Sequence, residues 1–237
     1  MFLLYHIYDK LKSAMIDLDS FFNGVGTNVD VWCGGDTNGV DLARMVEVAT
    51  QHNAHVVSVL PDVVPTVWPW LENSGVKIYG RFYLDEKIDV SSLSDLTIKI
   101  NQSFKYGANG AMVFVRYKNL SAMVDQVAFV RDDLFFNRDL VVGLDIGDVD
   151  SDDWADLFRE LKRINASAVC FVLTKDAGKK SDFVGRVYGL LNAWDSEFGG
   201  ALHFALENRP ERIDQARRLV ESIRPDLMSG LRFFVNY

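Results

Sequence analysis

Short runs rich in β-branched and aromatic residues recur along the chain roughly every 25–30 residues, each followed by a segment of different periodicity. The eight runs are Val29–Cys33, His55–Leu60, Val76–Tyr83, Ala111–Tyr117, Leu140–Ile146, Ala168–Thr174, Ala201–Leu206 and Leu231–Asn236. Apolar positions repeat at three and four in the intervening segments Val40–Thr50, Leu93–Tyr106, Trp154–Ile164 and Glu211–Ser222. Near-continuous apolar strands covered by helices are typical of a parallel sheet. The alternation therefore predicts an α/β fold.

Two parallel-sheet architectures compete for this pattern. Eight strand–helix units in 237 residues match the size of a single (β/α)8 TIM barrel. An open doubly wound sheet usually has fewer strands and a first turn of the form G-x-G-x-x-G. Residues 33–39, which read Cys-Gly-Gly-Asp-Thr-Asn-Gly, do not fit that form. We therefore predict the barrel, with the open sheet as the alternative.

No helix is expected after the eighth predicted strand, because only Tyr237 follows Asn236 in this sequence. Residues 2–22 carry apolar side chains at helical spacing, such as Leu11, Met15 and Leu18. We predict one domain, in which residues 1–28 form an N-terminal helix and linker and residues 29–237 form the barrel. The N-terminal helix is expected to take the place of the missing eighth helix. A helix that plugs the bottom of the barrel is the alternative.

Charge and composition exclude several classes of protein. The net charge of −8 repels phosphate backbones, so neither nucleic acid nor an anionic membrane is an expected partner. The longest apolar runs have the length of strands and cannot span a bilayer. No basic region precedes the apolar start, so a signal peptide is not expected. Cys33 and Cys170 lie inside apolar runs and are expected to be reduced thiols of a cytoplasmic protein.

Several segments carry a resemblance to a known family. They are Asp36–Leu42 (DTNGVDL), Val56–Pro61 with Val64-Pro65, Ser74–Ile78, Tyr106–Ala108 and the turn at Gly147. In order and spacing, these segments resemble deoxyribose-phosphate aldolase and the neighbouring lysine-dependent class I aldolase barrels. The likeness spans most of residues 29–225 and consists of packing and turn residues.

The resemblance implies a specific chemistry, for which this sequence lacks the expected residues. In the family, a lysine on the sixth strand forms a Schiff base, a second lysine on the seventh lowers its pKa, and an acid on the fourth moves protons. These three positions fall on Cys170, His203 and Met112. The family also binds phosphate on glycine-rich loops, whereas residues 207–211 here read Glu-Asn-Arg-Pro-Glu. The resemblance thus implies the ancestry of an aldolase without its imine-forming machinery.

Lys175 keeps an aldolase alternative open, because it stands at the mouth of the sixth predicted strand. A solvated loop lysine is the other interpretation, since Asp176, Lys179 and Lys180 surround it. Cys170 is a candidate nucleophile if His203 lies beside it on the next strand, because an imidazole can generate a thiolate. An inert core thiol is the competing interpretation of Cys170.

Polar residues near the carboxyl ends of the predicted strands are the remaining site candidates. We expect a ring of mixed charge formed by Asp30, Arg81, Arg116, Asp145, His203 and Glu207. Catalysis would be carried either by Lys175 as a displaced nucleophile or by acid–base work of His203 with Asp145 and Glu207. Asp30, Arg81, Arg116 and Glu207 are the candidates for substrate binding. The competing interpretation is that these charges neutralise one another inside a filled barrel.

We interpret the chain as a divergent aldolase-like pseudoenzyme that binds a small carbonyl or sugar-type metabolite or a protein partner. The alternative is an active carbon–carbon lyase or acid–base enzyme on small carbonyl or sugar compounds. No cofactor and no metal site are predicted. Trp68 and Trp70 flank Pro69 and are expected to pack on the core, with a homodimer contact as the alternative.

Overall fold

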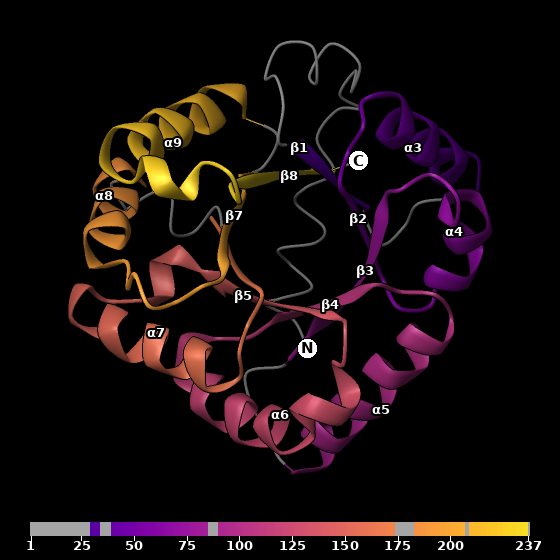
Figure 1. Cartoon of the computed structure of the whole chain (residues 1–237), viewed down its shortest axis with the longest axis horizontal. Coiled ribbons are helices and arrows are strands. Elements are labelled where there is room, and N and C mark those ends of the chain that lie inside the picture. Colours follow the sequence, from indigo (N-terminus) through magenta and orange to yellow (C-terminus); the bar gives the residue numbers. More distant parts are fainter. Residues whose placement is uncertain (1–28, 34–38, 85–89, 174–182, 207–208, 237) are drawn as a thin grey trace.

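The fold is a closed barrel of eight parallel strands, which follow one another around the barrel in sequence order (Figure 1). The computed structural model describes residues 29–33, 39–84, 90–173, 183–206 and 209–236. Its strands are β1 (Val29–Trp32), β2 (Val56–Val59), β3 (Lys77–Tyr83), β4 (Gly110–Phe114), β5 (Asp139–Asp145), β6 (Ala168–Val172), β7 (Ala201–Ala205) and β8 (Arg232–Asn236). The predicted (β/α)8 TIM barrel is confirmed. The N-terminal helix and linker predicted in residues 1–28 lie outside the described residues.

Helices form an outer ring around the strands (Figure 1). They are α3 (Gly39–Gln51), α4 (Val64–Leu71), α5 (Val90–Lys105), α6 (Leu120–Leu134), α7 (Trp154–Arg163), α8 (Phe183–Ala193) and α9 (Pro210–Ile223). The four helical segments predicted from periodicity coincide closely with α3, α5, α7 and α9. None of the helices in the described part of the chain has the length and apolar character needed to cross a bilayer.

Each strand separates two apolar layers, which explains why the strand sequences are almost continuously apolar. In β6, Val169 and Phe171 belong to the large cluster between the sheet and the helices. Ala168 and Cys170, at the alternate positions, belong to a second cluster inside the barrel. Side chains of a strand point alternately to its two faces. A polar residue on a strand is therefore buried on either face and requires a partner.

Helix α7 shows how the outer layer is built. Trp154, Leu157, Phe158 and Leu161 are buried, and they recur at spacings of three and four along the helix. The Trp154 ring meets the Phe171 ring of β6 edge-on, with 5.8 Å between centroids. Burial of such a stripe stabilises the fold by about 1.5–3 kcal/mol per large apolar side chain. The polar face of α7 is left to solvent.

The register of the strands defines the height of every interior side chain. The strands of a barrel are tilted relative to its axis. The residue at the same height on the next strand is therefore one position further along the chain than the hydrogen-bonded partner. Applied strand by strand from Asp30, this relation gives Tyr79, Val141 and His203 as the interior residues at the same height, and it returns to Asp30 after all eight strands. These four residues come from alternate strands and form one layer, as is usual in TIM barrels.

The other interior layers follow from the same register. From the amino ends of the strands upward, the layers are Val56/Gly110/Ala168/Arg232, Asp30/Tyr79/Val141/His203, Ser58/Met112/Cys170/Phe234, Trp32/Arg81/Gly143/Ala205 and Phe114/Val172/Asn236, with Tyr83 and Asp145 above them. In the fourth layer, the large side chains of Trp32 and Arg81 on β1 and β3 lie across the barrel from the small residues Gly143 and Ala205 on β5 and β7. Gly143 is required there because a Cβ atom at this position would collide with the Phe114 ring. Polar side chains, among them Asp30, His203 and Arg232, therefore lie in the two lowest layers, which we call the floor. Aromatic side chains lie near the upper end of the barrel.

Candidate functional site

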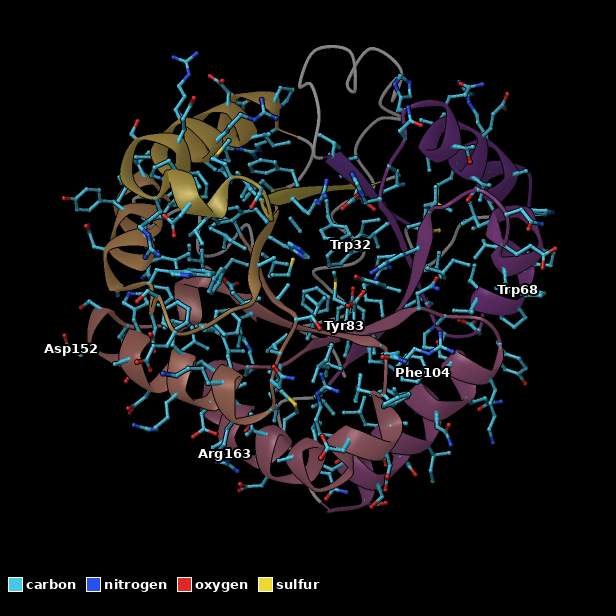
Figure 2. The ribbon with its side chains drawn as sticks, viewed as in Figure 1. Trp32, Trp68, Tyr83, Phe104, Asp152 and Arg163 are labelled. Atoms are coloured by element: carbon cyan, nitrogen blue, oxygen red, sulfur yellow. The ribbon has the colours of Figure 1, made fainter. Side chains whose placement is uncertain are left out.

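The mouth of the barrel is built from aromatic side chains on β1, β3 and β4. The Trp32 and Phe114 ring centroids are 5.0 Å apart, and Tyr83 stacks on Phe114 at 5.2 Å with an interplanar angle of 23°. Trp32 and Phe114 are buried, whereas Tyr83 is half-buried. Figure 2 shows Trp32 and Tyr83 inside the ring of strands, and Trp68 among the outer helices. The three rings form an apolar platform at the carboxyl ends of the strands, which we call the aromatic mouth.

Arg81 supports this platform from inside the barrel. Its side chain is completely buried, and its Cζ atom lies 4.2 Å from the centroid of the Trp32 ring. The guanidinium donates to the carbonyl oxygen of Cys33 and, at 3.4 Å, to that of Ser58. Carbonyl dipoles and an aromatic face both stabilise a buried cation. The predicted site residue Arg81 therefore joins the ends of β1 and β2 and lies beneath the aromatic mouth.

Asp145 and Arg116 lie at the rim, as predicted, and both have partners within the protein. Asp145 accepts a hydrogen bond of 2.8 Å from the Gly147 backbone N–H. Arg116 donates from Nη1 to both carboxylate oxygens of Asp148, at 2.8 and 2.7 Å. The Arg116–Asp148 pair is partly exposed, with 21% and 28% of the two side chains accessible. A polar ligand at the rim would exchange hydrogen bonds with these groups rather than meet isolated charges.

Cys170 and His203 are direct register partners on β6 and β7, so the predicted adjacency is present. Burial raises the pKa of the Cys170 thiol well above its ordinary value, an effect that Arg81 only partly offsets. Burial, with a smaller contribution from Arg232, lowers the pKa of His203 to about 3. Both shifts favour the neutral forms. The arrangement therefore opposes a thiolate–imidazolium pair and supports the alternative of an inert core thiol.

Asp30 lies near the bottom of the barrel rather than at the mouth. Its Oδ1 accepts hydrogen bonds from the backbone N–H groups of His55 and Val56, at the amino end of β2. Burial raises its pKa to about 6, although these backbone bonds and the charge of Arg232 act in the opposite direction. The expected single ring of charges is thus divided by height: Asp30 and His203 share a lower layer, while Arg81 and Asp145 lie above.

Two predicted site residues, Lys175 and Glu207, lie outside the described residues. Among the described strands, the lysine present is Lys77 at the amino end of β3. It donates to Asp139 at 2.6 Å and is about half exposed, with 53% of its side chain accessible. Within the described ranges, no group of three or more His, Cys, Asp or Glu side chains is placed to hold a metal ion.

Sequence reasoning missed the aromatic mouth and Arg232. Trp32 and Phe114 are inconspicuous within apolar runs, and only their heights in the barrel reveal that their rings meet. A signal exists in β3, where the period of two in residues 77–83 places Tyr79, Arg81 and Tyr83 on one face. The prediction that Trp68 and Trp70 pack on the core is wrong, since they are 40% and 45% exposed.

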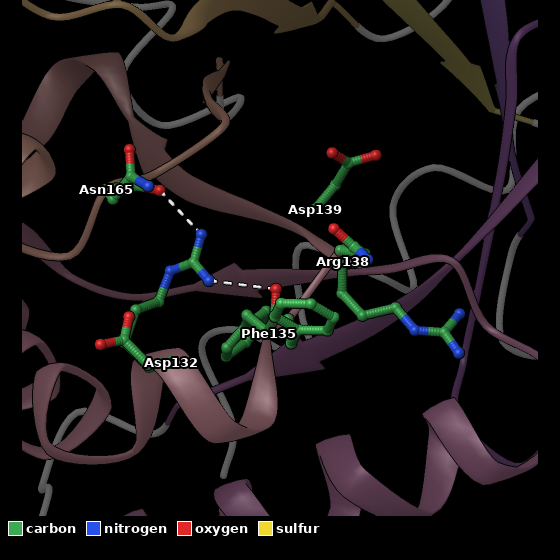
Figure 3. A pocket seen from close by; sticks show the side chains of 8 residues that line it. Asp132, Phe135, Arg138, Asp139 and Asn165 are labelled. Carbon is green, nitrogen blue, oxygen red and sulfur yellow. Dashed lines mark hydrogen bonds between the residues drawn. The ribbon is translucent and has the colours of Figure 1, made fainter.

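A cavity of about 560 Å³ lies at the opposite end of the barrel, between the ends of α6 and α7 (Figure 3). Arg131 lines it and donates to the carbonyl oxygens of Ile164, Asn165 and Phe135. These bonds tie the end of α6 to the turn that precedes β6. The position at the amino ends of the strands is the stability face of this fold, and Arg131 has a structural role there.

Comparisons with known proteins identify the architecture. No protein-family model matches the chain, and a search of curated protein sequences found no match. Among solved structures, the deoxyribose phosphate aldolase from Aeropyrum pernix is similar, with 13% identity, a TM-score of 0.65 and coverage of 94% of this chain and 93% of that chain. An aldolase called QR15 matches at 10% identity and a TM-score of 0.67, covering 89% of this chain and 90% of its own.

A third similar structure is D-psicose 3-epimerase, solved in the presence of D-fructose. It has 9% identity and a TM-score of 0.55, and the match covers 89% of this chain and 85% of the epimerase. At these identities, similarity establishes the fold alone. The chain therefore has the barrel fold that deoxyribose-phosphate aldolases also have.

Proposed function

We propose that this chain is a divergent aldolase-like barrel that lacks Schiff-base aldolase activity and binds a small sugar-type or carbonyl metabolite at the aromatic mouth. The observation that carries the proposal is the buried Cys170–His203 pair, which occupies the two strand positions where the family resemblance expects lysines. The fold likeness to sugar-phosphate aldolases supports the substrate class.

The chemistry of the two side chains supports the absence of an imine at these positions. A Schiff base requires a primary amine whose lone pair attacks a carbonyl carbon. Neither a thiol nor an imidazole can condense to an imine. The pKa shifts of Cys170 and His203 both favour the neutral forms, so acid–base work by this pair at neutral pH is also disfavoured.

The aromatic mouth supports a sugar-type ligand. One face of a sugar ring presents C–H groups that pack on an aromatic ring, while the hydroxyl groups need polar partners at the edge. Tyr83 and Phe114 provide stacked rings, and Asp145, Arg116 and Asp148 provide polar groups at the rim. Because Arg116 and Asp148 already satisfy each other, binding there would favour a neutral polyhydroxylated compound over a strongly charged one.

Borohydride trapping with glycolaldehyde tests the catalytic half of the proposal. Imine formation followed by reduction leaves a covalent mass increase that intact-protein mass spectrometry detects. We expect no adduct on strand residues, and peptide mapping would assign any adduct that forms. A stoichiometric adduct at Lys175 that is lost in Lys175→Ala would establish the active-aldolase alternative and overturn the proposal.

A thermal-shift screen tests the binding half, because a ligand that binds the native state raises Tm. The panel contains neutral sugars, sugar phosphates, small aldehydes and small acids. We expect neutral sugars to give the largest shift, and Tyr83→Ala to abolish it. Phe136→Ala is the matched control, since Phe136 is 75% exposed at the opposite end of the barrel. Equal shifts in both variants, or no shift with any neutral sugar, would contradict a site at the aromatic mouth.

A protein-binding role is the second function with an observation in its favour. Trp68 and Trp70 are exposed on α4, and the Trp68 ring lies against Gly107 at the end of α5. Exposed tryptophans are enriched at protein interfaces. If this surface forms a homodimer, analytical ultracentrifugation should show a dimer that Trp68→Ser with Trp70→Ser converts to a monomer.

A further inference from the structure

The lower layer of the barrel brings two buried titratable side chains to one height. The strand register places Asp30 of β1 and His203 of β7 in the same layer, on either side of β8. Two spacings between neighbouring strands separate their backbones by about 9 Å. Both side chains face the interior, and their accessible fractions are 0% and 6%. The two side chains therefore occupy the same buried layer of the barrel, away from solvent.

Each residue keeps one polar atom without a hydrogen-bond partner. Asp30 uses Oδ1 for the backbone N–H groups of His55 and Val56, at 2.8 and 3.0 Å, while Oδ2 has no partner. His203 likewise has no partner for Nδ1. Buried polar atoms in native proteins are almost always hydrogen-bonded, either to protein or to an ordered water. Two unpartnered atoms in one layer point to a shared third group.

The surrounding charges restrict what that group can be. Arg232 lies one layer below, and its charge acts on both Asp30 and His203. Asp139 Oδ2 accepts hydrogen bonds from the Tyr79 hydroxyl at 2.7 Å and from Lys77 Nζ at 2.6 Å. The titratable and charged groups at this end of the barrel are Asp30, His55, Lys77, Tyr79, Asp139, His203 and Arg232. Lys77 and Asp139 pair with each other, and the charge of Arg232 offsets that of Asp30 when Asp30 is ionised, so a small neutral molecule suits the remaining acceptor positions.

We propose that the floor of the barrel contains a built water site, in which one buried water bridges Asp30 Oδ2 and His203 Nδ1. With Asp30 ionised, the water donates one hydrogen to Oδ2 and the other to Nδ1. With Asp30 protonated, the carboxyl O–H donates to the water, and the water still donates to Nδ1. We assign His203 the tautomer with hydrogen on Nε2 in both cases. The site connects β1 to β7 across β8.

The tautomer and the water can be observed directly in the full-length wild-type protein. Long-range ¹⁵N–¹H NMR correlations of the His203 ring report which nitrogen is protonated. We expect an unprotonated, hydrogen-bonded Nδ1 and a protonated Nε2 between pH 5 and 8, with a nuclear Overhauser effect from a long-lived water to the ring. A protonated Nδ1, or a ring without contact to a long-lived water, would overturn the proposal.

A double-mutant cycle tests the energetic connection. Asp30→Ala and His203→Phe each remove one end of the bridge. His203→Phe should therefore lower the folding equilibrium constant less in the Asp30→Ala variant than in the wild type, and we expect the two effects to differ at least about threefold. Ser103→Ala, combined with His203→Phe, is the control. Ser103 also has a buried hydroxyl without a partner, but it lies on α5 outside the barrel. We expect control effects that multiply within about twofold.

Independent effects of Asp30→Ala and His203→Phe would contradict the bridge. If Asp30→Ala does not fold, Asp30→Asn retains an acceptor for the two backbone N–H groups and a donor toward the water. It should fold and leave the His203 tautomer unchanged. A switch to the Nδ1-protonated tautomer in Asp30→Asn would overturn the proposal, as would the wild-type NMR outcomes given above.

Discussion

The two ends of the barrel interior stabilise their buried polar side chains in different ways. At the upper end, Arg81 carries a full charge that backbone carbonyl groups and the Trp32 ring stabilise. At the lower end, Asp30 and His203 are shifted toward their neutral forms, and each keeps an unpartnered atom. Arginine retains its proton in proteins, whereas a carboxyl or an imidazole group can become neutral. The upper end therefore keeps a permanent charge that the protein itself must stabilise, and the lower end can respond to pH.

The largest effect should follow from removal of Arg81. Arg81→Ala leaves a large cavity beneath Trp32 and removes the donor to the Cys33 and Ser58 carbonyl groups, so we expect a loss of about 3–5 kcal/mol in the free energy of unfolding. Urea denaturation measures it. Arg138→Ala at the lower rim, where a half-buried guanidinium donates to the Ala108 carbonyl group, should cost only about 1 kcal/mol. Equal losses would remove the distinction between the two ends.

Tight packing at the aromatic mouth predicts the next largest effect. A Cβ atom at Gly143 collides with the Phe114 ring, so Gly143→Ala should destabilise the protein by about 1–3 kcal/mol. Gly39→Ala is the matched control, because a Cβ atom there meets no heavy atom within 4 Å. Thermal denaturation measures both variants. Phe114→Leu should partly rescue Gly143→Ala, and a rescue that fails would argue against this collision as the cause.

The lower end should show opposed pH dependences. The pKa of Asp30 rises from 3.8 to about 6 on folding, so its contribution to stability falls as pH rises through that range. The pKa of His203 falls from 6.5 to about 3, so its contribution is lost as pH falls from 6.5 toward 3. Between pH 4 and 6, the two contributions oppose each other in the wild type.

Single variants should separate these contributions. Relative to the wild type, the free energy of unfolding of Asp30→Asn should gain up to about 1.4 kcal/mol per pH unit as pH rises from 4 to 6. His203→Phe should show the opposite slope over the same interval. Urea denaturation in half-unit pH steps measures both. Slopes of the same sign in the two variants would contradict the opposite pKa shifts of Asp30 and His203.

The smallest effect is expected at the lower rim. Lys77 pairs with Asp139 at 2.6 Å, but 53% of the lysine side chain is accessible to solvent. Exposed ion pairs contribute about 0–1 kcal/mol and are screened by salt. Lys77→Ala should therefore lower Tm by only a few degrees in dilute buffer and by less in 1 M salt. A large, salt-independent decrease in Tm would mean that the Lys77–Asp139 pair behaves as a buried ion pair.

Much of the fold could be read from periodicity, because local sequence patterns reflect burial. The run Ala168–Thr174 was sufficient to locate β6 (Ala168–Val172), and the apolar stripe that includes Leu157 and Leu161 located α7. Such patterns predict elements because burial on one stripe or on both faces constrains residue type at fixed intervals. Their number and spacing then favoured the barrel over an open sheet.

The site was less predictable, because it depends on height within the barrel. Asp30 and Arg81 are both polar residues on interior strand positions, and the sequence offered no reason to separate them. The register places Asp30 at the floor and Arg81 two layers higher. The exposure of Trp68 and Trp70 was also hidden, since an apolar residue on a short helix is normally assigned to the core.

By itself, the sequence determined the order and type of the elements and placed Cys170 and His203 on the sixth and seventh predicted strands. Tertiary structure alone decided that Asp30 and His203 share one buried layer on either side of β8 and that Trp32, Tyr83 and Phe114 form one surface. The physical reason is the tilt of the strands on closure, since it sets which residues of distant strands share a height. Local periodicity carries no information about that stagger.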